Sequence, residues 1–362
     1  MEFCLNLSHH SWAKVTAPNG AVAATLDAIR VADQAGLDSV WVSEDPDGWD
    51  AFAVLGAAAP MTERIRLGTG VTNPYLRHPN LLAMSVATID RLSGGRAFLG
   101  LGRGQPEWYG RALGIEVGSP LRALEDAADL VRQWWTPPHT ATGGEHFHVA
   151  SWSHAFGPER VPPIYLAAVG PRALRLAARK FDGLLMTEFS SEAFLERIIT
   201  QTRTRLVDEG RSSDTFPVFV RTAIEVTDNP ERALAQRKNL IALINALPGM
   251  AHPIDVPGFD VPTIMARVRE VMHTDEVLAA GGGFIELRQV ADFAAARRLI
   301  PTELVDAVSY VGSAEKIREK LRRLAEIGVT HVFVSPSDQR DAAGYAELIA
   351  SVRPESTTQP PR

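Results

Sequence analysis

Short apolar, β-branched runs alternate with longer amphipathic stretches along most of the chain. The runs have the length of buried strands, and the stretches between them repeat apolar residues at the helical spacing. Strands that alternate with helices of this length pair in parallel. Eight runs are predicted as strands: residues 3–7, 39–43, 65–71, 97–101, 164–168, 183–187, 218–226 and 331–335.

Eight strands over this length favour a closed barrel, and an open, doubly wound sheet is the alternative. The fold class predicted is α/β: a (β/α)8 TIM barrel formed by residues 1–353 as a single domain. The tail at 354–362 is poor in apolar residues and is predicted to be disordered. Helical patterns lie at residues 21–35, 81–92, 121–135, 173–180, 192–207 and 314–327.

Three insertions interrupt this rhythm, at residues 105–119, 137–163 and 228–301. The second contains a predicted hairpin around Gly143-Gly144, and the third is rich in helical patterns. Insertions that follow strands lie at the C-terminal mouth of a barrel, where barrel enzymes bind substrate. We therefore expect the insertions at the mouth, with 228–301 covering it and forming part of the substrate pocket.

Composition narrows the function classes. The formal net charge of −6 gives no general attraction to nucleic acid or to anionic lipid. The chain shows neither a secretory signal pattern nor a long uncharged apolar stretch, so a cytoplasmic protein without a membrane span is expected. The one cysteine, Cys4, falls in an apolar run and is predicted to be a packed thiol. His146 and His148 have no neighbouring carboxylate cluster, so no metal site is predicted.

The third and fourth predicted strands end in two glycine-containing segments, at residues 67–75 and 98–104. Glycine at a strand end lets the backbone approach a flat ligand closely, although a glycine-rich turn is the simpler alternative. The second segment lacks the glycine spacing and the helix start of a dinucleotide fingerprint. In a barrel, its small residues are expected to leave room for a planar ring.

A third segment, residues 164–172, ends a strand and begins an amphipathic helix. Gly170 suits the N-cap, and Pro171 suits the first helical position because its missing N–H would be unpaired there. The free N–H groups and the helix dipole form an anion site, to which Arg172 or Arg175 adds charge. An ordinary capped helix is the alternative.

These segments, at 70–79, 92–104 and 167–172, resemble the luciferase-like monooxygenase superfamily, and in particular its methylenetetrahydromethanopterin reductase branch. Residues 311–316 and 328–331 fit the same pattern, so the resemblance covers most of the chain. It implies a barrel that carries coenzyme F420, or alternatively FMN, with hydride chemistry at the ring. It also implies a homodimer formed through helices near the second and third βα units. Locally, residues 51–60 are apolar nearly all round, which requires burial on more than one side.

The resemblance also implies the residues that contact the cofactor. It places the ring against the segment after the third strand, beside the end of the fourth strand, and the phosphate at the start of the helix near residue 171. A non-prolyl cis peptide bond is implied between Gly70 and Val71. The residues are Gly70, Val71, Thr72, Asn73, Gly102, Arg103, Gly104, Gln105, Ala168, Val169, Gly170, Pro171 and Arg172.

The proton-transfer group is left open, because relatives carry an acidic residue followed by histidine where this chain has Glu44 and Asp45. Many relatives also carry a carboxylate where this chain has Gln105. A carboxylate at the end of the second strand can serve as general acid or base, and a solvated acidic turn is the alternative. His9 and His10 end the first strand and so face the same mouth. They are candidates for the proton carrier or for shaping the pocket.

Three functions remain. The first is an F420-dependent oxidoreductase that transfers a hydride between the deazaflavin and a small organic substrate. The second is an FMN-dependent monooxygenase that receives reduced flavin from a partner reductase. The third is a flavin-binding barrel without catalysis, which the missing histidine makes worth testing.

Overall fold

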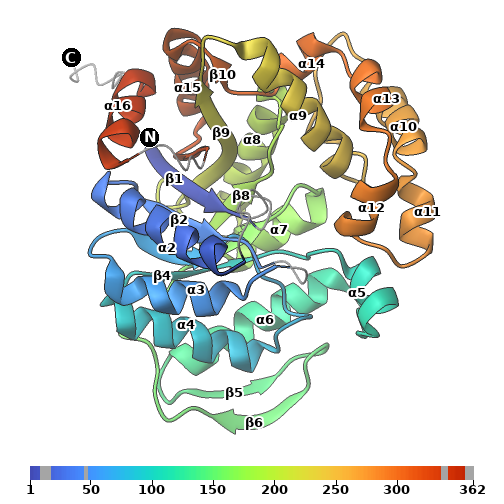
Figure 1. The fold of residues 1–362 in the computed structure, drawn as a ribbon. Coiled ribbons are helices and arrows are strands. Elements are labelled where there is room, and N and C mark those ends of the chain that lie inside the picture. The colour runs from blue at the N-terminus through green and yellow to red at the C-terminus, as the bar shows by residue number, and fades with distance from the viewer. Residues whose placement is uncertain (9–17, 45–47, 336–340, 355–362) are drawn as a thin grey trace.

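Eight parallel strands close into a barrel in the computed structural model, which describes residues 1–8, 18–44, 48–335 and 341–354 (Figure 1). β11 pairs with both β9 and β1, and β9 also pairs with β8, so the sheet has no open side. The predicted barrel and all eight predicted strands are confirmed. The strands are β1 (Glu2–Leu7), β2 (Ser39–Val42), β3 (Arg66–Thr69), β4 (Ala97–Leu101), β7 (Ile164–Ala167), β8 (Gly183–Met186), β9 (Val218–Val226) and β11 (His331–Val334).

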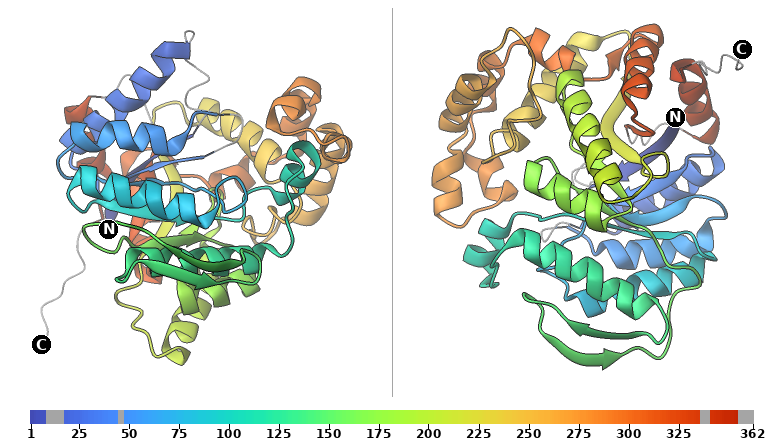
Figure 2. Two further views of the ribbon diagram at one scale, coloured as in Figure 1. Left: turned by 90° about the horizontal axis from the view of Figure 1, so that it is seen from below. Right: turned by 180° about the vertical axis from the view of Figure 1, so that it is seen from behind.

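Amphipathic helices surround the barrel (Figures 1 and 2). Helix α4 is typical: Pro79 occupies its first turn, Gly94 ends it in the left-handed conformation, and Leu82 and Val86 are buried on its inner face. No helix in the described residues is long and apolar enough to cross a membrane. The helices are α2 (Pro18–Gln34), α3 (Ala51–Ala58) with the 3-10 turn η1 (Ala59–Met61), α4 (Pro79–Ser93), α6 (Pro120–Trp135), α7 (Pro171–Lys180), α8 (Glu192–Asp208), α15 (Ala314–Ile327) and α16 (Ala342–Val352).

The barrel interior is filled by large aromatic side chains. Trp41 lies at the centre, with its ring centroid 4.5 Å from that of Phe98 and 4.8 Å from that of Phe219. Tyr165 and Phe333 complete the cluster. Cys4 packs here with no exposed surface, and burial raises the pKa of its thiol, so the predicted packed thiol is confirmed. The interior is a packed core, and it forms the floor of the C-terminal mouth.

Two insertions lie on the mouth side of the barrel (Figure 1). The first forms α5 (Pro106–Leu113), directly after β4. The longest begins after β9 and returns through β10 (Val311–Gly312), which pairs with Glu225 and Val226 at the end of β9. It has its own apolar core and contacts α5, where Arg111 donates to the carbonyl of Leu278 at 2.5 Å. Its helices are α9 (Pro230–Ile244), α10 (Val261–Val271), α11 (Thr274–Ala279), α12 (Phe284–Val290), α13 (Phe293–Leu299) and α14 (Thr302–Ala307).

The insertion at 137–163 corrects the expectation that every insertion lies at the mouth. It forms the predicted hairpin, β5 (Thr140–Gly143) and β6 (Val149–Ser153), but it follows helix α6 rather than a strand. It therefore leaves from the amino-terminal face and runs along the outside of α6, where Trp134 Nε1 donates to the Trp152 carbonyl at 2.8 Å. Only its tip reaches the mouth, where the His146 ring lies 5.9 Å from the Tyr75 ring.

Candidate active site at the barrel mouth

The three predicted cofactor segments come together at the mouth, because β3, β4 and β7 are neighbours in the barrel. The chain after β3 continues to pair with β4. Thr72 donates its N–H to the Gly100 carbonyl at 3.0 Å, and Gly102 donates to the Thr72 carbonyl at 2.9 Å. The peptide bond between Gly70 and Val71 is cis, which confirms the prediction made from the resemblance.

The carbonyl of Gly70 is held by two side chains, one that directly follows β2 and one from β9 on another side of the barrel. Ser43 Oγ donates to it at 2.7 Å, and Arg221 Nη2 donates to the same oxygen. A Cβ at position 70 would lie 2.5 Å from Trp41 Cβ, so only glycine fits. Nearby, the buried Oδ1 of Asn6 has no donor among the described residues. This floor therefore carries one fixed carbonyl and one unsatisfied acceptor.

The glycines at the end of β4 serve close strand packing. A Cβ at Gly100 would lie 2.0 Å from the Thr69 carbonyl oxygen, and a Cβ at Gly102 would lie 2.7 Å from Val71 Cγ2. The space beside these two glycines is thus taken by the backbone and side chain of the β3 segment. The expectation that both glycines leave room for a planar ring is corrected, because a sequence does not show which neighbour fills the space beside a glycine.

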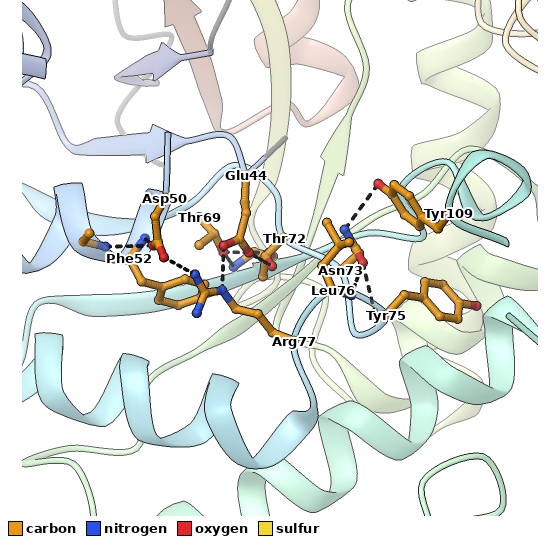
Figure 3. Close-up of polar contacts among 12 residues, drawn as sticks. Glu44, Asp50, Phe52, Thr69, Thr72, Asn73, Tyr75, Leu76, Arg77 and Tyr109 are labelled. Carbon is orange, nitrogen blue, oxygen red and sulfur yellow. Dashed lines mark hydrogen bonds and ion pairs between the residues drawn. The ribbon is translucent and has the colours of Figure 1, made fainter. Parts of the chain in front are cut away.

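Glu44, at the end of β2, has both carboxylate oxygens engaged (Figure 3). Arg77 Nε donates to Oε1 at 2.6 Å, and the hydroxyl of Thr72 donates to Oε2. The Glu44 side chain is 9% exposed. Because neither oxygen is free, this geometry suits a residue that positions the loops after β2 and β3. The other predicted catalytic residues, Asp45, His9 and His10, lie outside the described residues.

Arg77 links Glu44 to the start of α3 (Figure 3). It also pairs with Asp50, whose carboxylate caps α3 by accepting from the N–H groups of Phe52 and Ala53. Burial works to raise the pKa of Asp50, but the hydrogen bonds from Ala53 and Arg77 outweigh it and hold that pKa below its ordinary value. The guanidinium stacks over the Phe52 ring at 4.7 Å. One arginine thus ties three mouth segments together.

Replacing Arg77 with Met keeps its apolar stem but removes these ion pairs. We expect a loss of about 1.5–3 kcal/mol in the free energy of unfolding at neutral pH, the range for hydrogen bonds to charged groups. The folded-state pKa of Asp50 is depressed, so its contribution is present above the unfolded value of about 4 and is lost as the pH falls through the folded value. Urea unfolding between neutral and acidic pH measures this difference, which should shrink on acidification. A difference that grows on acidification contradicts the assignment.

Two predicted cofactor residues turn their side chains toward the protein. The Asn73 side chain is buried and accepts from the N–H groups of Tyr75 and Leu76 at 3.1 Å, which fixes the turn after β3 (Figure 3). Its Nδ2 donates to Tyr109 OH at 3.4 Å. The Thr72 hydroxyl is engaged with Glu44. These side chains shape the mouth, and Thr72 keeps no polar group free for a ligand, since its backbone N–H and carbonyl also pair with Gly100 and Gly102.

The segment after β4 leads into α5. Gly104 has a φ of 61°, and a Cβ there would lie 2.4 Å from Tyr109 OH. Gln105 is the N-cap of α5, without a capping hydrogen bond from its side chain. Arg103 and Gln105 are both partly exposed at this rim. The segment at 102–105, predicted to contact the cofactor, therefore lies beside the predicted segment after β3.

The start of α7 has the predicted geometry. Gly170 is the N-cap, with φ −90° and ψ 151°, and Pro171 takes the first helical position. No side chain caps this end, and a Cβ at Gly170 would meet nothing within 4 Å. Ala168 is buried, Val169 is half-buried and Arg172 is exposed. An uncapped helix start with open space in front of it can bind an anion.

Sequence reasoning missed Arg77, Arg221 and Ser43. Arg221 carries a detectable signal, because it is a charged residue that directly follows the apolar run Val218–Val220 within a barrel strand. Arg77 and Ser43 carry none, since their partners are distant in the chain. In the part of the chain that the structure describes, no three His, Cys, Asp or Glu residues group in a way that could hold a metal ion.

Comparison with known proteins gives a consistent pattern. Residues 1–331 match the family model of the luciferase-like monooxygenases. The chain is 28% identical to a 5,10-methylenetetrahydromethanopterin reductase of Archaeoglobus fulgidus, over 89% of this chain and 92% of that protein. It is 29% identical to a putative coenzyme F420-dependent oxidoreductase of Mycobacterium tuberculosis, over 89% and 93%. The solved F420-dependent tetrahydromethanopterin reductase of Methanopyrus kandleri shares the fold, with a TM-score of 0.73 and 23% identity over 97% of this chain and 98% of that one.

Proposed function

The chain belongs to the luciferase-like monooxygenase family, and from this premise we propose that it is an F420-dependent oxidoreductase acting on a small organic substrate. The observation that carries the proposal is the uncapped start of α7, which follows β7, the neighbour of β4 in the barrel. Two similar proteins whose names refer to F420 or to a methanopterin reductase align over 89% of the chain. This support favours F420 over FMN.

The residues at the mouth fit such a cofactor. Backbone N–H groups at Gly170 and Arg172 would hold its phosphate, since α7 supplies no cap of its own. The segments 70–73 and 102–105 would lie against the ring. The unpartnered acceptor of Asn6 fits a ligand that donates hydrogen bonds at this floor. When bound, a deazaflavin supplies hydride transfer at its C5.

The chain's own part in catalysis is to orient the reactants, exclude water and move a proton. The candidates for proton transfer are Asp45, His9 and His10, which follow β2 and β1 in sequence, and Glu44, whose two oxygens each accept a hydrogen bond. The helices α9–α14 would form one wall of the substrate pocket, because their segment leaves and returns at the end of β9.

The name of the matched family, luciferase-like monooxygenase, raises one alternative, an FMN-dependent monooxygenase. Anaerobic turnover with F420 and a panel of small alcohols, aldehydes and imines tests the proposal, read as a change in deazaflavin absorbance. Oxygen uptake with reduced FMN tests the alternative on the same substrates. Oxygen uptake without F420 turnover would reverse the assignment. If cofactor binds but neither assay responds to any substrate, a binding barrel without catalysis is favoured.

We further propose that the protein is a homodimer through α3 and α4. The outer face of α4 exposes Leu81, Met84 and Leu92, each about half exposed, and Met61 of η1 lies beside it. Ala53 and Ala57 of α3 are small and exposed, which permits close approach of a second helix.

Light scattering at micromolar concentration should give a dimer mass for the wild type. Met84→Asp should give a monomer, because it would bury a charge in the interface. Val207→Asp is the matched control: Val207 is an apolar residue of α8, 68% exposed, on the other side of the barrel. It should leave the dimer intact. A monomeric wild type would refute the proposal.

A further inference from the structure

An arginine-lined hollow lies on the outer flank of the barrel, apart from the mouth. It is formed between α6, α7 and α8, which lie side by side in the view from behind (Figure 2), and has a volume of about 460 Å³. Three helices contribute guanidinium groups to its wall, with one each from α6 and α8 and three from α7. They are Arg122, Arg172, Arg175, Arg179 and Arg205.

The three arginines of α7 form one row. Their spacing of three and four residues places them on a single helix face, and the opposite face is buried through Leu174, Ala177 and Ala178. At about 1.5 Å of rise per residue, successive guanidinium stems start about 4.5 and 6 Å apart along the axis. In an extended peptide, side chains on the same side lie about 6.6–7.2 Å apart, close to the larger of these two steps, so carboxylates along one can reach successive arginines. The row begins two residues after the Gly170 N-cap.

Three of these guanidinium groups are not fully paired with other residues. Arg172 and Arg175 are exposed and form no ion pair with any described residue, and Nη1 of Arg205 is buried without a partner. Guanidinium groups without an ion-pair partner favour carboxylate or phosphate ligands, which they bind through paired hydrogen bonds.

Three acidic residues share the wall: Glu125, Asp208 and Glu209. Glu125 is already paired with Arg179 at 2.6 Å and lies 3.6 Å from Arg122, which also contacts Glu145 at 3.0 Å. Five arginines against these three carboxylates and Glu145 still leave the hollow positive. Its attraction for an anion is strongest along Arg172 and Arg175, at the end nearest the α7 start.

We propose that this hollow binds a chain of carboxylates that continues from an anionic group at the α7 N-terminus. This inference rests on the proposed function, since the matching part of F420 is the glutamate chain beyond its phosphate. A free oligocarboxylate has the same chemistry and is the other source to be tested. The hollow would thus add affinity outside the mouth without touching the reacting atoms.

The test compares three probes by calorimetry at low salt: F420 with its glutamate chain, F420 with the chain removed, and free triglutamate. Removal of the chain should weaken binding to the wild type about fivefold, the size expected of exposed ion pairs. Arg175→Glu should weaken the chain-bearing form by about the same factor and leave the chainless form unchanged. Arg175→Lys should retain most of the affinity. Arg30→Glu, on α2, is the matched surface control and should change nothing.

The outcomes separate the two proposals. If the wild type binds both F420 forms equally and binds no triglutamate, the hollow is not a carboxylate site, while the proposed function stands. If neither F420 form binds, the proposed function fails, and triglutamate binding that is lost in Arg175→Glu still supports the hollow. If Arg175→Glu weakens both forms equally, the arginine acts on the fold or the phosphate, and the inference is overturned.

Discussion

Gly170→Asp should weaken F420 binding at least tenfold, or about 1.4 kcal/mol. The carboxylate would stand at the N-cap of α7, where we propose that the uncapped N–H groups and the positive end of the helix dipole hold the phosphate. An aspartate there would both repel the phosphate and cap the helix itself, which removes donors from the ligand. Fluorescence titration of the purified variant measures the change.

Gly170→Ala is the matched control for shape. The Gly170 φ of −90° suits any residue, and a Cβ would meet nothing within 4 Å. Alanine should therefore bind F420 nearly as well as the wild type. Unchanged affinity in Gly170→Asp removes the phosphate assignment, and equal losses in both variants show that shape rather than charge matters at this position.

Gly100→Ala should destabilise the fold by about 3 kcal/mol, at the upper end of the usual range for overpacking. The added Cβ would lie 2.0 Å from the Thr69 carbonyl oxygen, which is backbone and cannot rotate away. The two strands are also fixed to each other, because Thr69 Oγ1 donates to the Gly100 carbonyl at 2.8 Å and accepts from its N–H at 3.1 Å. Urea unfolding measures the loss.

Gly110→Ala in α5 provides the comparison for this variant. A Cβ at Gly110 would lie 3.5 Å from Val117 Cγ2, an ordinary contact, and alanine favours the helix by roughly 0.5–1 kcal/mol over glycine. This variant should be as stable as the wild type or slightly more stable. If Gly100→Ala unfolds at the same urea concentration as the wild type, β3 and β4 do not approach each other as closely as described here.

The barrel could be predicted from the sequence because a strand buried on both sides appears in the sequence as a short apolar run. β4 and β9 have the predicted bounds, and α15 begins and ends at the predicted residues 314 and 327. The Gly170 N-cap followed by Pro171 was also predictable, since both residues have a conformational preference at that position. Local chemistry was enough for these features.

Features that depend on distant neighbours could not be predicted in this way. The ion pair between Glu44 and Arg77 joins residues 33 positions apart, and the contact between Arg221 and the Gly70 carbonyl joins residues 151 apart. The glycines at the end of β4 were predicted to lie at the mouth, which is correct, but they were predicted to leave room for a ring. Periodicity does not show that Val71 fills the space beside Gly102. The hairpin at 137–163 was predicted, but its location was not, because it follows helix α6 and so leaves from the amino-terminal face of the barrel.

Parallel titrations of the wild-type protein with F420 and with FMN test most directly whether the mouth is built for a deazaflavin cofactor. Fluorescence should report F420 binding in the micromolar range, about −8 kcal/mol, with FMN binding at least tenfold weaker. FMN binding tighter than F420 binding would contradict the assignment.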